Sequence, residues 1–361
     1  MKIAAPFPGV RRVSVTALGD HPDRIDVRSP AEFALDHVPS ATNHPVLDDA
    51  ERERVGTLYA ASPFEARRLG AAIVARNIAA MLESAFADRP REWQPLVYCW
   101  RGGQRSRALV QVMHEIGWRA VQLEGGYRAY RRHVVAELAR VPQRFRYVAI
   151  CGLTGSGKSR LLVSLADAGA QTLDLEGIAR HRGSLLGGLP GEKQPSQKAF
   201  ESALLDALSR LDPARPVFVE SESRRIGALQ MPDALLEAMR IGSALTLSLP
   251  REQRVALLKD EYAHFFAAPE ALAGCLTPLV EVHGKAKIAR WQAMAKGADW
   301  DALIAELLEK HYDPIYARSL ERNFAPRDPR VIEASAITRE AFAALAHDVR
   351  TLIENETEIA R

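Results

Sequence analysis

In the first third of the chain, short apolar runs alternate with segments whose apolar residues have the spacing of a helix. The runs RIDV, LVYC and AVQL have the pattern of buried strands, and the last one leads into a Gly-Gly turn. After the first run, Ser29 as N-cap, Pro30 at the first helical position and Glu32 at the third form a helix-start signal. After the second run, apolar residues at 108, 109, 112, 113 and 116 predict a helix over 105–116. This alternation predicts an α/β domain with a parallel sheet.

A second alternation of the same kind begins at Tyr147. The run YVAIC predicts a strand, a glycine-rich loop follows it, and residues 158–168 predict a helix that Gly169 ends. Further buried strands are predicted in QTLDLEG, PVFVESES and SALTLSLP. From Arg251 onward the pattern is mostly helical. The expected fold class is therefore α/β, with two parallel-sheet domains, the second of which has a mostly helical C-terminal part.

The segment between the two patterns predicts a basic helical connector. Val134, Val135 and Leu138 have the spacing of one apolar helix face, and Pro142 marks the boundary. We therefore expect a first domain at residues 1–128, a connector at 129–146 and a second domain at 147–361. A length of 361 residues agrees with two domains.

Composition and charge exclude some classes of protein. No apolar run approaches the ~20 residues of a membrane span, and the N-terminus lacks the apolar stretch of a signal peptide, so we expect a cytoplasmic protein with no membrane partner. Three widely spaced cysteines without a CxxC pair argue against a disulfide framework or a zinc site. The net charge is only +3, but six arginines and one acid lie between Arg128 and Arg146, which makes a local basic stripe.

The stretch CWRGGQRS, which begins at Cys99, places a cysteine between a predicted strand and a predicted helix. Such a junction directs backbone N–H groups and the positive end of the helix at one centre, where an anion binds and a thiolate is stabilised. Arg101 and Arg105 strengthen both effects. We therefore predict that Cys99 is a nucleophile and that both arginines belong to its catalytic site. The other two cysteines lie in apolar surroundings and are expected to be structural.

The stretches IDVRSPAEFALDHVPSATN and YCWRGGQRS together resemble a rhodanese domain, whose cysteine carries a persulfide in sulfurtransferases. The spacing from Cys99 to Arg105, C-x5-R, is one residue longer than in the usual sulfurtransferase loop and equals that of rhodanese-like and tyrosine phosphatases. The longer loop is expected to admit a larger, tetrahedral oxyanion. A phosphatase or a phosphate-like donor therefore stays open beside sulfur transfer.

The stretch GLTGSGKS fits the phosphate-loop pattern G-x-x-x-x-G-K-[ST] and lies between a predicted strand and a predicted helix, as the motif requires. Lys158 is expected to reach the distal phosphates, and Ser159 to bind Mg²⁺. The other metal partner is expected to be an acid at a strand end, with Glu220 as first choice and Glu222 as second. The predicted phosphate-binding residues of the loop are Gly152, Thr154, Gly155, Ser156, Gly157, Lys158 and Ser159.

Two arginines outside the loop complete this predicted site. Arg251 and Arg254 lie three residues apart on one predicted helix face, as lid arginines do in small kinases. The motif predicts a place for a di- or triphosphate and does not by itself predict ATP hydrolysis, because any pyrophosphate ester satisfies the same N–H groups.

The pairing of a rhodanese module with a phosphate-loop module resembles the tRNA 2-selenouridine synthase family over nearly the whole chain. HRGSLLGG, QPSQKAFE and VESESRRIG also carry this resemblance. It implies an enzyme that alkylates 2-thiouridine at the wobble position of tRNA with geranyl diphosphate and then replaces the S-geranyl group with selenium from selenophosphate. It further implies that the phosphate loop holds the diphosphate and that Cys99 is the nucleophile that handles selenium. A selenophosphate-producing enzyme is then an expected partner.

A tRNA substrate has to reach both sites, so basic residues are candidate contacts to its phosphate backbone. The candidates in and beside the connector, and around the phosphate loop, are Arg128, Arg131, Arg132, Arg144, Arg182, Arg224 and Arg225.

Two other functions stay open on the residues alone. A rhodanese-like phosphatase fused to a small-molecule kinase would use the same two loops, although the basic connector counts against it. A non-catalytic tRNA-binding or scaffold protein would need neither Cys99 nor Lys158. The sequence does not locate the prenyl chain, for which the stretch GSLLGGLPG, residues 183–191, is one candidate lining.

Overall fold

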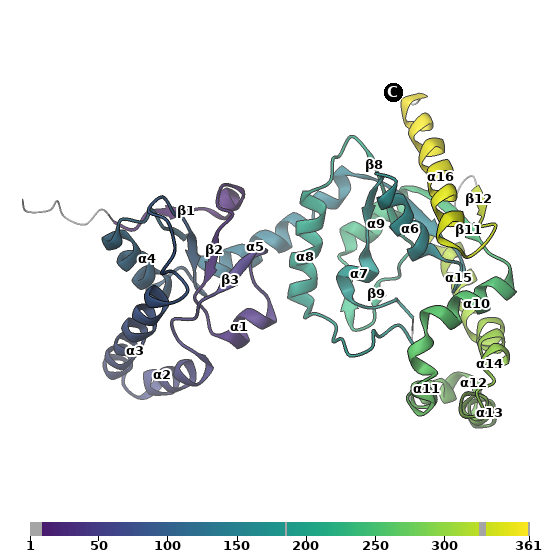
Figure 1. Ribbon diagram of the computed structural model, residues 1–361, viewed down its shortest axis with the longest axis horizontal. Helices are drawn as coiled ribbons and strands as arrows, with labels where there is room; N and C mark the ends of the chain where they lie inside the picture. Colours follow the sequence, from purple (N-terminus) through teal and green to yellow (C-terminus); the bar gives the residue numbers. More distant parts are fainter. Residues whose placement is uncertain (1–8, 185, 325–329, 360–361) are drawn as a thin grey trace, which may run out of the picture. The chain divides into compact units, whose positions relative to one another are not determined.

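The computed structural model describes residues 9–184, 186–324 and 330–359, and it divides the chain into two compact units. Unit 1 runs to Glu137 and includes Ser196–Asp206, and unit 2 holds Leu138–Pro195 and the chain from Ala207 onward. Each unit has its own parallel sheet (Figure 1). The segment expected as a connector is shared between them, because helix α5 (Gly126–Leu138) lies almost wholly in unit 1 and the 3-10 helix η2 (Val141–Arg144) lies in unit 2.

The sheet of unit 1 has five parallel strands in the order β1-β5-β4-β2-β3. The strands are β1 (Arg12–Val13), β2 (Arg24–Asp26), β3 (Ala41–Asn43), β4 (Leu96–Tyr98) and β5 (Val121–Leu123). In addition to α5, the helices of unit 1 are η1 (Val15–Asp20), α1 (Pro30–Leu35), α2 (Asp49–Ala61), α3 (Pro63–Glu83) and α4 (Gln104–Ile116). Apolar side chains of the sheet and of α3 and α4 form the core, and Cys99 lies within it.

Two local signals in the sequence account for the start of α1 and the packing of α4. Ser29 caps α1, with Pro30 at its first position, and the Glu32 carboxylate accepts a hydrogen bond from the Ser29 N–H at 3.3 Å. The predicted helix over 105–116 is present as α4, which buries Leu109 and Met113. Of these two helices, α4 directly follows the loop that begins at Cys99.

The sheet of unit 2 also has five parallel strands, in the order β12-β11-β6-β8-β7. The strands are β6 (Arg146–Cys151), β7 (Gln171–Leu173), β8 (Pro216–Glu220), β11 (Ser243–Ser248) and β12 (Arg330–Glu333), and a separate antiparallel pair consists of β9 (Arg225–Ile226) and β10 (Leu229–Gln230). Helices α6 (Lys158–Asp167) and α16 (Arg339–Ile359) pack together on the sheet, and their apolar side chains share its core. The other helices of this part are α7 (Leu175–Ala179), α8 (Gln197–Ser209), whose residues are divided between the units, and α9 (Asp233–Ile241).

A helical subdomain follows β11 and has its own apolar core around the fully buried Trp291. Its elements are α10 (Arg251–Glu261), η3 (Ala263–Phe265), α11 (Pro269–Leu276), η4 (Thr277–Leu279), α12 (Val280–His283), α13 (Lys285–Lys296), α14 (Trp300–Leu307), the π-helical turn η5 (Leu308–Tyr312) and α15 (Asp313–Phe324). The prediction of a mostly helical C-terminal part is therefore confirmed. It overlooked β12, which extends the sheet by pairing with β11.

The predicted strand in QTLDLEG is shorter than its apolar pattern indicates. β7 ends at Leu173 because Asp174 caps α7, where its carboxylate accepts a hydrogen bond from the Gly177 N–H at 2.7 Å. The α/β fold class, with parallel sheets in both parts of the chain, is confirmed.

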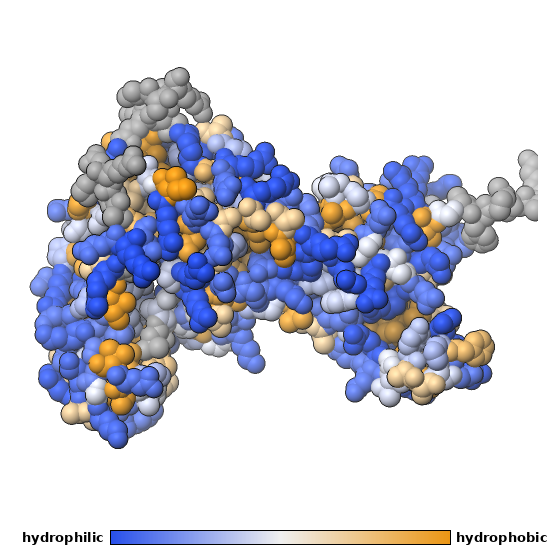
Figure 2. Space-filling model, turned by 180° about the vertical axis from the view of Figure 1, so that it is seen from behind, coloured by the Kyte–Doolittle hydropathy of each residue, from blue (hydrophilic) through white to orange (hydrophobic). Residues whose placement is uncertain are grey.

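The face of the molecule in Figure 2 is mostly hydrophilic, with apolar side chains in small separate groups. This is the usual character of a protein surface in water. In the described part of the chain, no helix is both long enough and apolar enough to cross a membrane.

Candidate functional site

The Cys99 sulfur lies at the end of β4 and receives two hydrogen bonds from the loop that follows. The Gly103 N–H donates to it at 3.3 Å, and the Ser106 hydroxyl donates to it at 3.2 Å. Cys99 itself is buried. Two hydrogen-bond donors of this loop and the start of α4 are therefore directed at one sulfur, an arrangement that suits a cysteine nucleophile.

A buried glutamine supports this arrangement from the neighbouring strand. The Gln122 side-chain amide on β5 donates to the Ser106 hydroxyl oxygen at 2.7 Å and to the Gly103 carbonyl at 3.0 Å. Because the Ser106 oxygen accepts this bond, its hydrogen is left for the Cys99 sulfur at 3.2 Å or the Gly103 carbonyl at 3.4 Å. Sequence reasoning missed Gln122, although a fully buried amide inside the apolar strand VQL is a signal of such a role.

Two glycines allow the cysteine loop to pack against the turn after β5. A Cβ on Gly126 would lie 2.3 Å from the Cys99 carbonyl oxygen, and one on Gly102 would lie 2.6 Å from the Leu123 carbonyl oxygen. Both residues also have positive φ, which favours glycine. The Tyr127 N–H then donates to the Cys99 carbonyl at 2.9 Å. The cysteine loop is thus held against the turn that follows β5.

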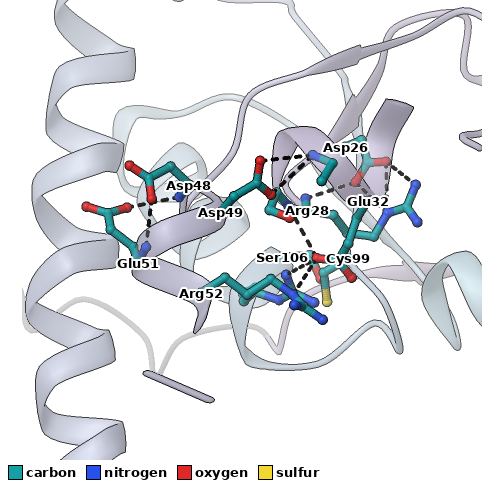
Figure 3. Close-up of polar contacts among 12 residues, drawn as sticks. Asp26, Arg28, Glu32, Asp48, Asp49, Glu51, Arg52, Cys99 and Ser106 are labelled. Carbon is teal, nitrogen blue, oxygen red and sulfur yellow. Dashed lines mark hydrogen bonds and ion pairs between the residues drawn. The ribbon is translucent and has the colours of Figure 1, made fainter. Parts of the chain in front are cut away.

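The two predicted catalytic arginines have different surroundings. Arg105 donates to the Glu32 carboxylate at 3.0 Å. Arg52 makes a second 3.0 Å contact to the same carboxylate, and both Arg52 and Glu32 are labelled in Figure 3. Burial alone would raise the pKa of Glu32, but the hydrogen bond and charge of Arg105, together with Arg52, hold this pKa below its usual value. Arg101 is exposed and lines a surface pocket of about 500 Å³ with Arg12 and other residues.

A buried ion pair forms a rigid base near the cysteine loop. The Arg28 guanidinium donates to the Asp26 carboxylate at 2.6 Å and lies over the Tyr127 ring, 3.9 Å from its centroid. The Tyr127 hydroxyl donates to Asp36 at 2.7 Å. Because each buried charge has a partner, this network fixes the segments that surround Cys99.

The phosphate loop of unit 2 borders a pocket of about 410 Å³. Lys158 reaches back over the loop, and its ammonium group donates to the Gly152 carbonyl at 3.0 Å. A Cβ on Gly157 would lie 2.4 Å from the Phe342 ring, so only glycine fits there. Of the seven predicted loop residues, those that line the pocket are Thr154, Gly155, Gly157, Lys158 and Ser159.

The acid beside Ser159 is Glu176, which sequence reasoning did not consider. The Ser159 hydroxyl donates to the Glu176 carboxylate at 2.8 Å, and Glu176 lines the pocket. Glu220, the acid chosen from the sequence, is fully buried, and one of its carboxylate oxygens accepts from the Leu175 N–H at 3.3 Å. Glu176 follows β7, and an acid after a strand in the same sheet was the available signal.

The carboxyl groups near Lys158 have raised pKa values, so their charged forms are disfavoured. Burial raises the pKa of Glu176, and the charges of Asp174 and Glu261 add to this effect. Burial, followed by the charge of Glu176, raises the pKa of Glu222 to about 8. Burial, followed by the charge of Glu176, raises the pKa of Glu220 as well. A cation in the pocket would oppose these effects, because it favours the charged form of each carboxylate.

The two predicted lid arginines do not share one role. Arg254 is buried, and it donates to the Thr154 carbonyl of the phosphate loop at 2.9 Å and to Asp313 at 2.5 Å. Arg251 instead donates to the Glu309 carboxylate at 2.7 Å, and it is not among the described residues that line the pocket. The structure therefore brings Arg254 to the loop and leaves Arg251 away from it.

The candidate tRNA contacts differ in how free their side chains are. Arg131 is mostly buried in unit 1, where it contacts Glu201 and the Ser202 hydroxyl. Arg182 lines the phosphate pocket and donates to the Glu261 carbonyl at 2.6 Å. The exposed candidates are Arg128, Arg132, Arg144, Arg224 and Arg225.

The remaining cysteines have opposite surroundings. Cys151 is buried, and burial raises the pKa of its thiol to about 11, which agrees with the structural role expected for it. Cys275 is exposed on α11, so it does not fill the core as its apolar neighbours in the sequence indicated.

Family comparisons match both units. Residues 16–133 match the family described as the rhodanese-like domain. Residues 145–273 match the family described as the tRNA 2-selenouridine synthase AAA domain.

Whole-chain relatives agree with these matches. The tRNA 2-selenouridine synthase of Shewanella halifaxensis (strain HAW-EB4) is 32% identical over 345 residues, which are 86% of this chain and 91% of that protein. Proteins of the same name from Shewanella loihica (strain ATCC BAA-1088 / PV-4) and Sulfurovum sp. (strain NBC37-1) are 33% and 34% identical, over 81% and 83% of this chain and 85% and 89% of their own lengths. The chain belongs to the tRNA 2-selenouridine synthase family.

Proposed function

We propose that this protein converts 2-thiouridine at the wobble position of tRNA to 2-selenouridine in two steps. Geranyl diphosphate alkylates the sulfur in the first step, and selenophosphate supplies the selenium in the second. The observation that carries the proposal is the presence, in one chain, of a thiol loop with two donors on the Cys99 sulfur and a phosphate loop with Lys158. The names of the relatives support the overall conversion.

The phosphate pocket of unit 2 suits the alkylation step. The thiocarbonyl sulfur forms a bond to C1 of the geranyl group, the C1–O bond breaks, diphosphate leaves, and the N3 proton of the base passes to solvent. The main demand is to neutralise the departing diphosphate. Lys158 and the loop N–H groups meet that demand, and the thiocarbonyl sulfur needs no strong base because it is already a soft nucleophile.

Mg²⁺ fits the oxygen donors of this pocket. The Ser159 hydroxyl and the Glu176 carboxylate lie together at its edge. Within the described residues there is no cluster of three acidic, histidine or cysteine side chains suited to a metal, but Mg²⁺ is commonly bound by one or two carboxylates together with substrate phosphates and waters. Ser159 and Glu176 would hold the ion, and the bound ion would supply positive charge to the leaving diphosphate.

The cysteine loop of unit 1 suits the selenium step. The Cys99 thiolate attacks the phosphorus of selenophosphate, an S–P bond forms, the P–Se bond breaks, and hydroselenide is released. Hydroselenide then attacks C2 of the S-geranyl base and expels geranyl thiolate, which takes a proton from solvent. Water finally hydrolyses the S–P bond to give phosphate and the free thiol. No step changes the oxidation state of phosphorus or selenium.

The loop geometry supports phosphorus as the point of attack. The C-x5-R spacing suits a tetrahedral oxyanion, and the Gly103 N–H before the start of α4 lies beside the sulfur, where it can contribute to binding the anion. Glu32 orients Arg105 at the edge of this loop. A cytoplasmic location and a partner enzyme that produces selenophosphate are part of the same proposal.

The tRNA backbone contacts the exposed arginines in this proposal. Arg128, Arg132 and Arg144 are exposed, so their guanidinium groups can neutralise phosphates. Arg131 is a weaker candidate for a phosphate contact than these three arginines, because its guanidinium is already paired with Glu201.

The test is to incubate the purified protein with tRNA that contains 2-thiouridine, geranyl diphosphate and selenophosphate, and to identify the nucleosides by mass spectrometry after digestion. We expect 2-selenouridine, and S-geranyl-2-thiouridine when selenophosphate is withheld. Unchanged 2-thiouridine in the complete mixture would contradict the proposal. The C-x5-R loop would then favour a phosphatase fused to a kinase, which phosphatase and kinase assays would identify.

A further inference from the structure

We propose that an apolar pocket next to the phosphate loop receives the prenyl chain of the diphosphate donor and sets its length. This inference rests on the proposed function, because it concerns the donor of the alkylation step. The pocket lies between the phosphate loop and the helical subdomain. Its lining residues are Thr154, Ser184, Leu186, Leu258, Tyr262, Phe265, Phe266, Leu272, Trp300, Leu303, Ile304, Leu307, Leu308 and Tyr312.

The apolar pocket and the phosphate pocket adjoin each other. Thr154, Ser184, Leu258 and Tyr262 line both of them. A single donor can therefore place its diphosphate at Lys158 and its chain in the apolar pocket. The Thr154 hydroxyl is buried and has no hydrogen-bond partner among the described residues, so it is available to a ligand at this junction.

The polarity of the lining favours a hydrocarbon chain over a nucleoside. The polar side chains are confined to the shared edge and to Tyr312. Burial raises the pKa of Tyr312, and a hydrogen bond with Ser184 acts in the opposite direction. The other lining residues, including those from α14, are aliphatic or aromatic. A purine base in this pocket would leave its polar edge without partners, which is costly, whereas a prenyl chain has no polar atoms to satisfy.

The size of the pocket indicates which residues limit the chain. The cavity is only about 60 Å³, which is less than a ten-carbon chain requires, so side chains of the lining have to move when the donor binds. Trp300 and Ile304 are partly buried and pack on the edge of the subdomain core, so they can move with less loss of packing than Leu303, which is fully buried. Trp300 and Ile304 lie on α14, and no residue of α14 lines the phosphate pocket. They are therefore the residues that the far end of the chain meets.

Part of this lining lies in GSLLGGLPG, the stretch that the sequence indicates as a candidate lining for the prenyl chain. Ser184 and Leu186 of GSLLGGLPG border the pocket, and Leu185 lies outside the described residues. The larger part comes from the helical subdomain, where the apolar residues carry no motif.

The test compares donors of five, ten and fifteen carbons, namely dimethylallyl, geranyl and farnesyl diphosphate, in the alkylation of tRNA. Ile304→Trp shortens the pocket, and we expect the ratio of geranyl to dimethylallyl transfer to fall by about tenfold or more. Trp300→Ala lengthens it, and we expect farnesyl transfer to rise relative to geranyl transfer. Ile241→Trp is the matched control, because Ile241 is highly exposed on α9 and lies outside the pocket.

Each variant is also tested for binding of inorganic pyrophosphate and for selenium incorporation into presynthesised S-geranyl-2-thiouridine tRNA, both of which should match the wild type. Unaltered donor preference in Ile304→Trp and Trp300→Ala, with the wild type active, would overturn the pocket assignment. If Ile304→Trp does not fold, the result from Trp300→Ala decides. A wild type that transfers no prenyl group from any donor would instead refute the proposed function, and competition of ATP with geranyl diphosphate that is lost in Ile304→Trp would assign the pocket to a nucleoside.

Discussion

The Ser106 hydroxyl oxygen lies 3.2 Å from the Cys99 sulfur and is the side-chain donor to it among the hydrogen bonds of the described residues. Since Gln122 donates to the same hydroxyl oxygen at 2.7 Å, the hydroxyl hydrogen is free to point at the sulfur. The reactivity of Cys99 should therefore depend on a residue seven positions further along the chain.

Replacing Ser106 with alanine should slow the alkylation of Cys99 by iodoacetamide at pH 7 by about tenfold, because a hydrogen bond to a charged group contributes about 1.5–3 kcal/mol. The rate is followed by mass spectrometry of the Cys99 peptide. Ser84→Ala, at an exposed position after α3, is the control. An unchanged rate in Ser106→Ala would mean that the hydroxyl does not stabilise the thiolate.

Glu32→Gln should lower stability in a pH-dependent manner. The pKa of Glu32 is lowered in the folded state by Arg105 and Arg52, so its contribution to stability is complete above the usual carboxyl pKa of 4.5 and is lost as the pH falls through the folded value. The melting temperature of Glu32→Gln should therefore lie below that of the wild type at pH 7, and the two should converge in acid. A difference that does not change with pH would show that packing, and not charge, is responsible.

Arg254→Met and Arg251→Met form a matched pair for the phosphate pocket. Arg254 supports the Thr154 carbonyl and is paired with Asp313, whereas Arg251 contacts Glu309 away from the pocket. The first variant should lose about tenfold in affinity for inorganic pyrophosphate, because its removal frees the loop and leaves a carboxylate without its partner. The second should change affinity by less than about twofold, as exposed ion pairs usually contribute little. Isothermal titration measures both, and equal losses would contradict the assignment.

The thiols of Cys151 and Cys275 should differ sharply in reactivity. Burial raises the pKa of Cys151 to about 11, so this thiol keeps its proton at pH 8, whereas Cys275 is exposed. We expect iodoacetamide at pH 8 to modify Cys275 within minutes and to leave Cys151 unmodified until the protein unfolds. Because the folded state holds the Cys151 proton more tightly, stability should decrease as the pH rises from the usual value of 9.0 towards 11. Early modification of Cys151 in the folded protein would contradict this account.

The parts of the structure that were predictable from the sequence are those that neighbouring residues determine. The cap of α1, the helix α4 and the strand–loop–helix order around Lys158 depend on residues within a few positions of each other. Local patterns of this kind are visible in a single sequence.

The parts that were missed depend on contacts between distant segments. Glu176 is paired with Ser159 by the order of the strands, and Gln122 meets Ser106 because β5 lies beside β4. Arg251 and Arg254 look alike in the sequence, but the position of α10 places only Arg254 at the loop. The apolar pocket is built largely from helices whose apolar residues are typical of any core.

The central claim is that the two loops perform separate steps, and it is tested most directly by supplying the intermediate. Lys158→Ala and Cys99→Ser are each given selenophosphate and tRNA that already contains S-geranyl-2-thiouridine. The tRNA is then digested, and its nucleosides are identified by mass spectrometry. We predict that Lys158→Ala produces 2-selenouridine at close to the wild-type rate, while Cys99→Ser leaves the S-geranyl nucleoside unchanged. Loss of conversion in Lys158→Ala, or normal conversion in Cys99→Ser, would contradict this division of labour.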